Sequence, residues 1–274
     1  MIAERSNDQL IERESPKGKR VSLFVTCMVD MLHPQTGISV VQVLEHLGLE
    51  IDFPAGQTCC GQPAYNAGYH NEAKEVAKIF LKVFRSAEVI VAPSGSCATM
   101  VRVDYPKLFA DDPEYLAEAE RISSITWEFT EFLVDGLGIE NLDGVFPEKQ
   151  TFAFHDSCHG LRMMGIKEAP RKLVSNIQNA DIIPLDGAEE CCGFGGLFSI
   201  KLPNVSAAIL DKKLTSVQDN EADWILLGDV SCMTNMNTAL EKQGKPKRIK
   251  HVADVLAEAI LNSGAKLEEN RGGN

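Results

Sequence analysis

The chain has 274 residues, and its 27 Lys and Arg residues against 39 Asp and Glu residues give a formal net charge of −12. Nucleic acid and anionic membrane surfaces would repel such a chain, so we expect neither as a partner. The 44% of hydrophobic and 24% of charged residues are typical of a globular protein. No apolar run approaches the ~20 residues of a membrane helix, which predicts no membrane insertion.

The first half of the chain predicts strands that alternate with helices. Short apolar runs predict strands at 21–25, 49–53 and 88–92. Helical spacing of apolar residues predicts helices from Ile38 to Leu47 and from Ala73 to Phe84. We expect 112–135 to be one long helical region that joins the halves, and 136–150 to be a linker.

The second half repeats this order. Strands are predicted at 151–154, 181–185 and 224–227, with helices over 167–177 and 205–217. Continuously apolar strands between helices favour parallel sheets that are covered on both faces. The sequence therefore predicts an α/β fold.

The eight cysteines form two sets of four with the same spacing. The first set is Cys27, Cys59, Cys60 and Cys97, and the second is Cys158, Cys191, Cys192 and Cys232. Subtracting the numbers of matching members gives 131, 132, 132 and 135 residues. An internal repeat of this length indicates two similar domains.

The domain organisation follows from this duplication. We expect two open, mostly parallel-sheet domains over residues 20–140 and 150–262, related by a pseudo-twofold axis. The polar ends, 1–19 and 265–274, are expected to be disordered tails. Every cysteine follows a predicted strand, and the carboxyl ends of parallel strands share one edge of a sheet. Each set of four is therefore expected to meet in space, near the domain interface.

Four thiolates in one place can hold a zinc ion or an iron–sulfur cluster. Structural zinc usually takes cysteines spaced as Cys-x₂₋₄-Cys. Adjacent cysteines such as Cys59 and Cys60 point their side chains differently, which suits two irons of one cluster. We expect Cys97 and Cys232 near helix N-termini, where the helix dipole favours thiolate.

The first twenty residues contain no apolar segment of the kind that a secretory signal needs, so we expect a cytoplasmic protein. Thiols are kept reduced in the cytoplasm. Eight cysteines there point to metal binding or redox chemistry rather than to a disulfide scaffold.

The motifs around the cysteines resemble the cysteine-rich CCG-domain family. They are the segments 21–31, 59–66, 93–97 and 191–196, and the resemblance covers roughly 20–261. It is strongest to the lactate-utilisation protein A group and the glycolate oxidase iron–sulfur subunit, and more distant to the cysteine-rich subunit of heterodisulfide reductase. In that distant relative each site closes with Cys-x-x-Cys, whereas here Met100 and Asn235 stand at the final position.

This resemblance implies a function and a cofactor. It implies an iron–sulfur electron-transfer subunit of an oxidoreductase complex that oxidises L-lactate, or a related 2-hydroxyacid such as glycolate, to the 2-oxoacid. Each cysteine set would bind a [4Fe–4S] cluster, with one or two clusters per chain. The implied partners are lactate-utilisation proteins B and C, or an equivalent flavin or iron–sulfur redox subunit. The absent fifth cysteines argue against direct disulfide chemistry.

Other interpretations stay open at this point. Zinc could occupy one half, or the chain could be a zinc-bound scaffold without catalysis, or a subunit of a disulfide or quinone reductase. His155 and His159 flank Cys158. They are either structural residues that bond strand-end carbonyls, or, for His159, a proton donor or partner beside a cluster.

Overall fold

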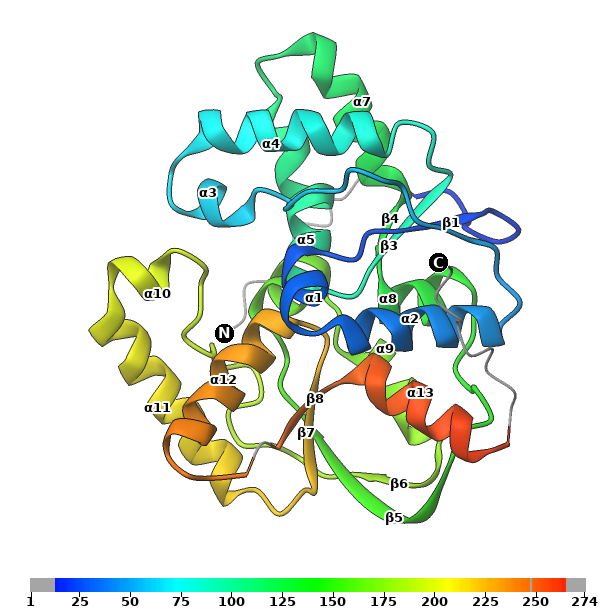
Figure 1. Ribbon diagram of the computed structural model, residues 1–274, viewed down its shortest axis with the longest axis vertical. Helices are drawn as coiled ribbons and strands as arrows, with labels where there is room; N and C mark the ends of the chain where they lie inside the picture. The colour runs from blue at the N-terminus through cyan, green and yellow to red at the C-terminus, as the bar shows by residue number, and fades with distance from the viewer. Residues whose placement is uncertain (1–12, 247, 265–274) are drawn as a thin grey trace, which may run out of the picture.

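The computed structural model describes residues 13–246 and 248–264, and these form two four-stranded sheets in which all paired strands are parallel (Figure 1). The first sheet has the order β2-β1-β3-β4, with β1 (Val21–Leu23), β2 (Ile51–Asp52), β3 (Val89–Ala92) and β4 (Thr126–Glu128). The second has the order β6-β5-β7-β8, with β5 (Val145–Phe154), β6 (Gln178–Ile182), β7 (Trp224–Leu227) and β8 (Ile249–His251). The two orders match, which confirms the predicted α/β fold and its duplication.

Helices connect the strands in both halves. The first half contains α1 (Cys27–Leu32), α2 (Pro34–His46), α3 (Gln62–Asn66), α4 (His70–Val83), α5 (Gly95–Thr99), η2 (Met100–Asp104), α6 (Tyr105–Leu108), α7 (Pro113–Ile125), α8 (Phe129–Glu131) and η3 (Phe132–Gly136). The second half contains η4 (Gly160–Met164), α9 (Glu168–Ser175), α10 (Phe198–Lys201), α11 (Pro203–Asp219), α12 (Val230–Lys242) and α13 (Val252–Asn262).

Three predicted elements differ from the structure. The region 112–135 is not one helical segment, because α7 ends at Ile125 and β4 forms the edge of the first sheet. This strand is three residues long and follows α7 directly, so it is too short for a periodic pattern to mark it in the sequence. The expected linker 136–150 already contains the start of β5 at Val145, and β6 begins three residues before the predicted strand.

The ends of the chain are described only in part. Residues 1–12 and 265–274, which make up most of the expected disordered tails, lie outside the described residues. The segment that begins at Arg13 packs on the rest of the protein, since the guanidinium carbon of Arg13 lies 3.4 Å from the ring centroid of Trp127. Arg13 also pairs with Glu131 at 2.8 Å. Part of the expected N-terminal tail is therefore ordered.

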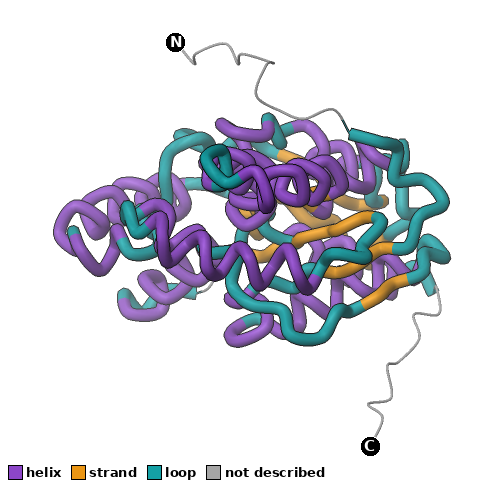
Figure 2. Tube along the Cα trace, turned by 90° about the horizontal axis from the view of Figure 1, so that it is seen from above, coloured by secondary structure: helices purple, strands orange, loops and turns teal. Residues whose placement is uncertain are grey.

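Both sheets share one central core. Leu23 and Val91 of the first sheet lie in the same buried cluster as Phe152 and Leu226 of the second. Successive residues of a strand point to opposite faces, so neighbours such as Ile90 face a separate outer core instead. Figure 2 shows the strands lying between layers of helices. The halves are thus parts of one packed unit.

The halves are related by a pseudo-twofold axis. Helix α2 of the first half packs on α13 of the second, and the equivalent α9 of the second half packs on α8 and η3 of the first (Figure 1). In the same way α1 contacts α12, and η4 contacts α5. Each contact recurs with the roles of the halves exchanged, which is what a twofold relation requires.

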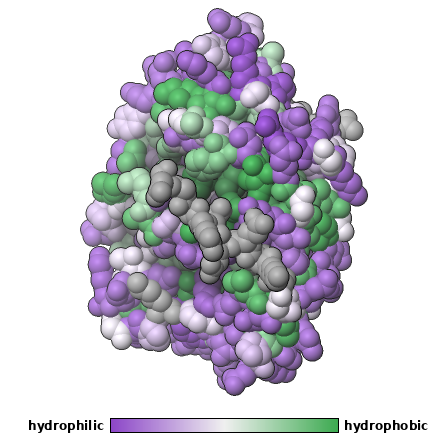
Figure 3. Space-filling model, turned by 45° about the vertical axis from the view of Figure 1, so that its right-hand side comes forward, coloured by the Kyte–Doolittle hydropathy of each residue, from purple (hydrophilic) through white to green (hydrophobic). Residues whose placement is uncertain are grey.

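The surface of the face drawn in Figure 3 is hydrophilic toward both ends and more hydrophobic toward the middle. Within 13–246 and 248–264, no helix combines the length and the apolar character that crossing a membrane would demand.

Candidate metal centres

All eight cysteines lie beyond the carboxyl ends of strands, as predicted. Cys27 and Cys158 follow β1 and β5 by four residues, and Cys97 and Cys232 follow β3 and β7 by five. The adjacent pairs lie in the loops after β2 and β6. Because equivalent strands end at equivalent places, the duplication of the fold brings each set of four to one edge of its sheet.

Helix starts position two of these cysteines. Cys97 is the third residue of α5, and its backbone N–H donates to the Ser94 hydroxyl at 3.3 Å. Cys232 is the third residue of α12, which is capped by Asp229 through a hydrogen bond from the Ser231 N–H at 3.1 Å. The predicted place of both cysteines near helix N-termini is therefore confirmed.

The first set of cysteines is joined by side-chain hydrogen bonds. Cys59 accepts from the thiols of Cys27 and Cys60, and Cys60 also lies within hydrogen-bond reach of Cys97. The Gly61 N–H points to the Cys59 sulfur at 3.5 Å. The four sulfurs consequently form one contiguous group.

The second set repeats this arrangement. Cys191 accepts from the thiols of Cys158 and Cys192, and the Gly193 N–H points to the Cys191 sulfur at 3.3 Å. The sulfurs of Cys192 and Cys232 lie 3.0 Å apart. Both sets expected from the repeat are thus assembled, and all eight residues are free cysteines.

The hydrogen bonds between the cysteine sulfurs lower the pKa of some thiols and raise the pKa of others. The hydrogen bond from Cys27, with that from Cys60, lowers the pKa of Cys59 to about 3. The hydrogen bond to Cys59 raises the pKa of Cys27 well above its usual range, and burial adds to this effect. Each set therefore has a sulfur that ionises readily beside others that are held as thiols. A thiolate-binding metal would displace the remaining protons, since thiolate is the form that binds metal.

The two sets have different surroundings. His155, which is 2% exposed, is the first residue after β5, and its equivalent after β1 is the buried Phe24. One ligating atom each of His155, Cys192 and Cys232 lie within 4.8 Å of one another. Burial, with the charge of Lys213, lowers the pKa of His155 to about 3, so this imidazole is neutral near pH 7.

Lys213 on α11 is a second polar residue near the second cysteine set whose equivalent in the first half is apolar. The interval of the adjacent cysteine pairs, 132 residues, places Leu81 at the equivalent point of α4. The Lys213 ammonium donates to the carbonyls of Gly187 and Ala188 at 2.7 and 3.3 Å. Burial lowers its pKa to about 8. The spacing of the cysteine motifs does not reveal this lysine. Aligning the two repeats does, because a lysine in the second half then stands opposite a leucine in the first.

The cysteine-bearing loops of the two halves meet, as expected. Ser94 and Asp229 form an antiparallel bridge, and the Gly95 N–H donates to the Gly228 carbonyl at 3.0 Å. The Ser96 N–H donates to the Asp229 carboxylate at 2.8 Å. A cavity of about 40 Å³ is lined by all four cysteines of the first set and by Phe194, Gly196, Asp229, Val230 and Ser231 of the other half. The first set is thus closed off by the second half.

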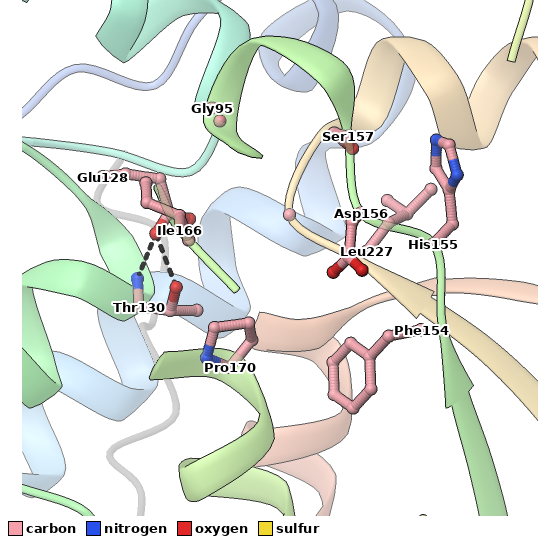
Figure 4. A pocket seen from close by; sticks show the side chains of 12 residues that line it. Gly95, Glu128, Thr130, Phe154, His155, Asp156, Ser157, Ile166, Pro170 and Leu227 are labelled. Atoms are coloured by element: carbon pink, nitrogen blue, oxygen red, sulfur yellow. Dashed lines mark hydrogen bonds between the residues drawn. The ribbon is translucent and has the colours of Figure 1, made fainter. Parts of the chain in front are cut away.

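A second interface cavity, of about 30 Å³, contains the buried carboxyl of Glu128 (Figure 4). One carboxyl oxygen accepts from the N–H and the hydroxyl of Thr130 at 2.8 and 2.6 Å. The other oxygen has no hydrogen-bond partner among the described residues. Figure 4 shows the His155 ring pointing away from Glu128 and Thr130. No cysteine lines this cavity, although His155 does, and the sequence carried no signal for Glu128.

Residues 21–102 and 152–237 match the family model of the cysteine-rich CCG domain, one repeat in each half. The chain belongs to this family of cysteine-rich proteins. It is 47% identical over 242 residues to lactate utilization protein A of an Exiguobacterium species, covering 88% of this chain and 98% of that protein. It is 45% identical over 237 residues to lactate utilization protein A of Bacillus velezensis, with coverages of 86% and 98%.

Comparison with solved structures adds nothing to this assignment. The chain was aligned with glutamate racemases of Francisella tularensis and Campylobacter jejuni at 12% identity and TM-scores of 0.33 and 0.28. These alignments cover 89% and 92% of this chain and 80% and 88% of the racemases. TM-scores this low establish no common fold.

Proposed function

We propose that this chain is an iron–sulfur electron-transfer subunit of a complex that oxidises L-lactate, or a related 2-hydroxyacid, to the 2-oxoacid. The observation that carries the proposal is the assembly of two contiguous four-cysteine groups at the carboxyl ends of the two sheets. The similarity to lactate utilization protein A over nearly the whole chain supports the choice of substrate.

The donor groups of each set suit a [4Fe–4S] cluster. Cys27, Cys59, Cys60 and Cys97 would hold one cluster, and Cys158, Cys191, Cys192 and Cys232 the other. The N–H groups of Gly61 and Gly193 already point at cysteine sulfurs, and hydrogen bonds to sulfur tune the potential of such centres. When bound, a cluster of this kind supplies one-electron chemistry.

The oxidation of a hydroxyacid removes two electrons, and a hydride or its equivalent needs a cofactor such as a flavin. We therefore place the substrate-oxidising centre in a partner, namely lactate-utilisation proteins B and C or an equivalent redox subunit. In this view the chain acts in the cytoplasm. Its two functional units are the CCG domains over residues 20–140 and 150–262.

Metal analysis tests the proposal. The full chain, purified without oxygen, is expected to hold about eight irons and eight acid-labile sulfides if both sets are loaded, and about four of each if one is. Cys60→Ser and Cys192→Ser alter equivalent buried ligands of the two sets. With both sets loaded, each variant is expected to lose the iron of its own half only. Both variants are also expected to impair growth on lactate.

Other results would contradict the proposal. Zinc without labile sulfide would favour a zinc-bound scaffold protein. Unchanged iron content together with unchanged lactate-supported growth in both variants would remove the cysteines from the function. Electron transfer to a disulfide or quinone would instead support a role in a reductase.

A further inference from the structure

We propose that the imidazole of His155 is a fifth protein donor to the metal centre of the second cysteine set. The two centres of the chain would then differ in their ligands: four sulfurs would serve the four irons of the first cluster, whereas one iron of the second would bind the imidazole nitrogen in addition to its cysteine sulfur. This inference rests on the proposed function, since it takes the second set to bind iron.

The position of the imidazole is the first support. His155 is 2% exposed, and one of its ring nitrogens belongs to a group with the Cys192 and Cys232 sulfurs in which all three atoms lie within 4.8 Å. Histidine and cysteine are both common metal ligands. Since the three side chains come from the end of β5, the loop after β6 and the start of α12, the fold itself brings these donors together.

The unmet hydrogen bonds of the ring are the second support. Neither nitrogen of His155 has a partner of normal hydrogen-bond geometry among the residues that the structure describes. Burying a polar group without a partner is unfavourable, and buried polar atoms in native proteins are generally paired. The ring does have a hydrogen bond to the backbone of Ala188 that raises the pKa of His155, although it falls outside normal geometry, and the Ala188 carbonyl also accepts from the Asp156 N–H at 2.9 Å. The nitrogen that does not face Ala188 is left for a metal in the second set, and a carbonyl partner on the other ring nitrogen is the usual arrangement of a metal-binding histidine.

The duplication supplies the third support. Phe24 stands at the equivalent point of the first half, fully buried, with its ring centroid 4.8 Å from that of Phe80 and 5.8 Å from that of Phe84. In the first half, where the residue after the strand only packs in the core, an apolar phenylalanine ring occupies this position. The second half instead buries a polar ring beside two sulfurs, which is explained if the ring has a partner that the first half lacks.

His159 is the competing donor. Its Nδ1 atom lies 3.6 Å from the Cys158 sulfur, so it also stands near the second set. Unlike His155, it is partly exposed, and water can satisfy its other nitrogen. His159 therefore needs no metal to account for its position, and it provides a matched control.

Nitrogen hyperfine spectroscopy tests the assignment. The full chain is labelled with ¹⁵N-histidine, purified without oxygen and reduced, and the paramagnetic centres are examined by pulsed EPR. A directly bound nitrogen is expected in the wild type and in Cys60→Ser, which keeps the second set intact. The signal is expected to vanish in His155→Phe, which copies the first half, and to persist in His159→Gln.

Iron content and reduction potential complete the test. His155→Phe is expected to retain most of the iron, because four cysteines remain. It is also expected to raise the reduction potential of the second centre, because the variant loses a nitrogen donor that adds electron density to the iron while all four thiolates remain. Circular dichroism checks that each variant folds. The nitrogen signal in the EPR spectrum of the wild type tests the proposal even if a variant fails to fold.

Failure of the His155 assignment can be distinguished from failure of the proposed function. Full iron and sulfide without a bound nitrogen in the wild type, or a nitrogen signal that survives in His155→Phe, would overturn this inference alone. Loss of the signal in His159→Gln with its retention in His155→Phe would assign the donor to His159. Absence of both iron and sulfide from the wild type would overturn the proposed function as well.

Discussion

Glu128 and His251 occupy equivalent positions, and each caps the helix that follows it. Glu128 ends β4 and accepts from the N–H groups of Thr130 and Glu131, at the start of α8. His251 ends β8 and accepts through Nδ1 from the Ala253 N–H at 3.2 Å, at the start of α13. Both are buried. The duplication has kept the capping role while the two side chains differ in their acid–base chemistry.

The carboxyl of Glu128 predicts a dependence of stability on pH. Burial raises its pKa from 4.5 to about 7, against the opposing effect of its hydrogen bonds. Between these values the folded state binds more protons than the unfolded state, so stability falls as pH rises, by up to about 3 kcal/mol. Glu128→Gln keeps an oxygen for the cap and cannot ionise.

Denaturant unfolding at pH 5 and pH 7.5 checks this prediction. The variant is expected to lose less stability than the wild type between the two values. An identical loss in both proteins would mean that folding does not raise the pKa of Glu128.

Gly193 and Gly61 form a matched pair for testing how tightly the two cysteine loops pack. Both have positive φ, +83° and +85°, so alanine is strained at either position. A Cβ at Gly193 would lie 2.6 Å from the Ser206 carbonyl oxygen, whereas at Gly61 the nearest atom would be 3.5 Å away. We expect Gly61→Ala to cost about 1–2 kcal/mol and Gly193→Ala to cost more.

Thermal unfolding of the two glycine variants gives the comparison. Gly193→Ala is also expected to reduce the metal content of the second set, because its neighbour Cys192 must shift. Equal melting temperatures would contradict the difference in packing.

Arg102 and Glu131 form a buried ion pair. The guanidinium contacts both carboxylate oxygens at 3.0 Å, and the two side chains are 2% and 5% exposed. Arg102→Met leaves the buried carboxylate with Arg13 as its ion-pair partner among the described residues. Since removing one member of a buried pair strands the other charge, we expect a loss of about 3–5 kcal/mol, near the lower end.

The control for this prediction is Lys107→Met. Lys107 pairs with Asp104 at 3.6 Å, and its side chain is 47% exposed. Exposed pairs contribute ~1 kcal/mol or less. Chemical denaturation of both variants should therefore separate them clearly, and similar small losses would show that the Arg102 pair does not stabilise the fold.

Lys213 predicts a difference in potential between the two metal centres. Its buried charge acts on Cys192 and Cys232, while the equivalent Leu81 carries none. At pH 7 a nearby positive charge favours the reduced form of a centre. Lys213→Met is therefore expected to lower the reduction potential of the second centre.

The neighbouring Lys212→Met is the control, because Lys212 is exposed and pairs with Glu190. A redox titration followed by EPR is expected to show a shift for the Lys213 variant only. Equal potentials in both variants, with iron content unchanged, would argue against an electrostatic role for Lys213.

The local sequence pattern was sufficient to predict the features that the two halves share. The two cysteine sets, their places after strands and the helix starts at Cys97 and Cys232 follow from spacing and apolar periodicity. Such features depend on residues that are close in the chain. They also recur 131 to 135 residues apart, so each half supports the interpretation of the other.

Tertiary structure alone decided how the halves combine. The three-residue β4, the packing of α2 on α13 and the buried carboxyl of Glu128 have no signature in the sequence. Nor does local pattern place His155 near the sulfurs of Cys192 and Cys232. Those contacts join segments far apart in the chain, which come together only through the pairing of the strands within each sheet and the packing of the two sheets on each other.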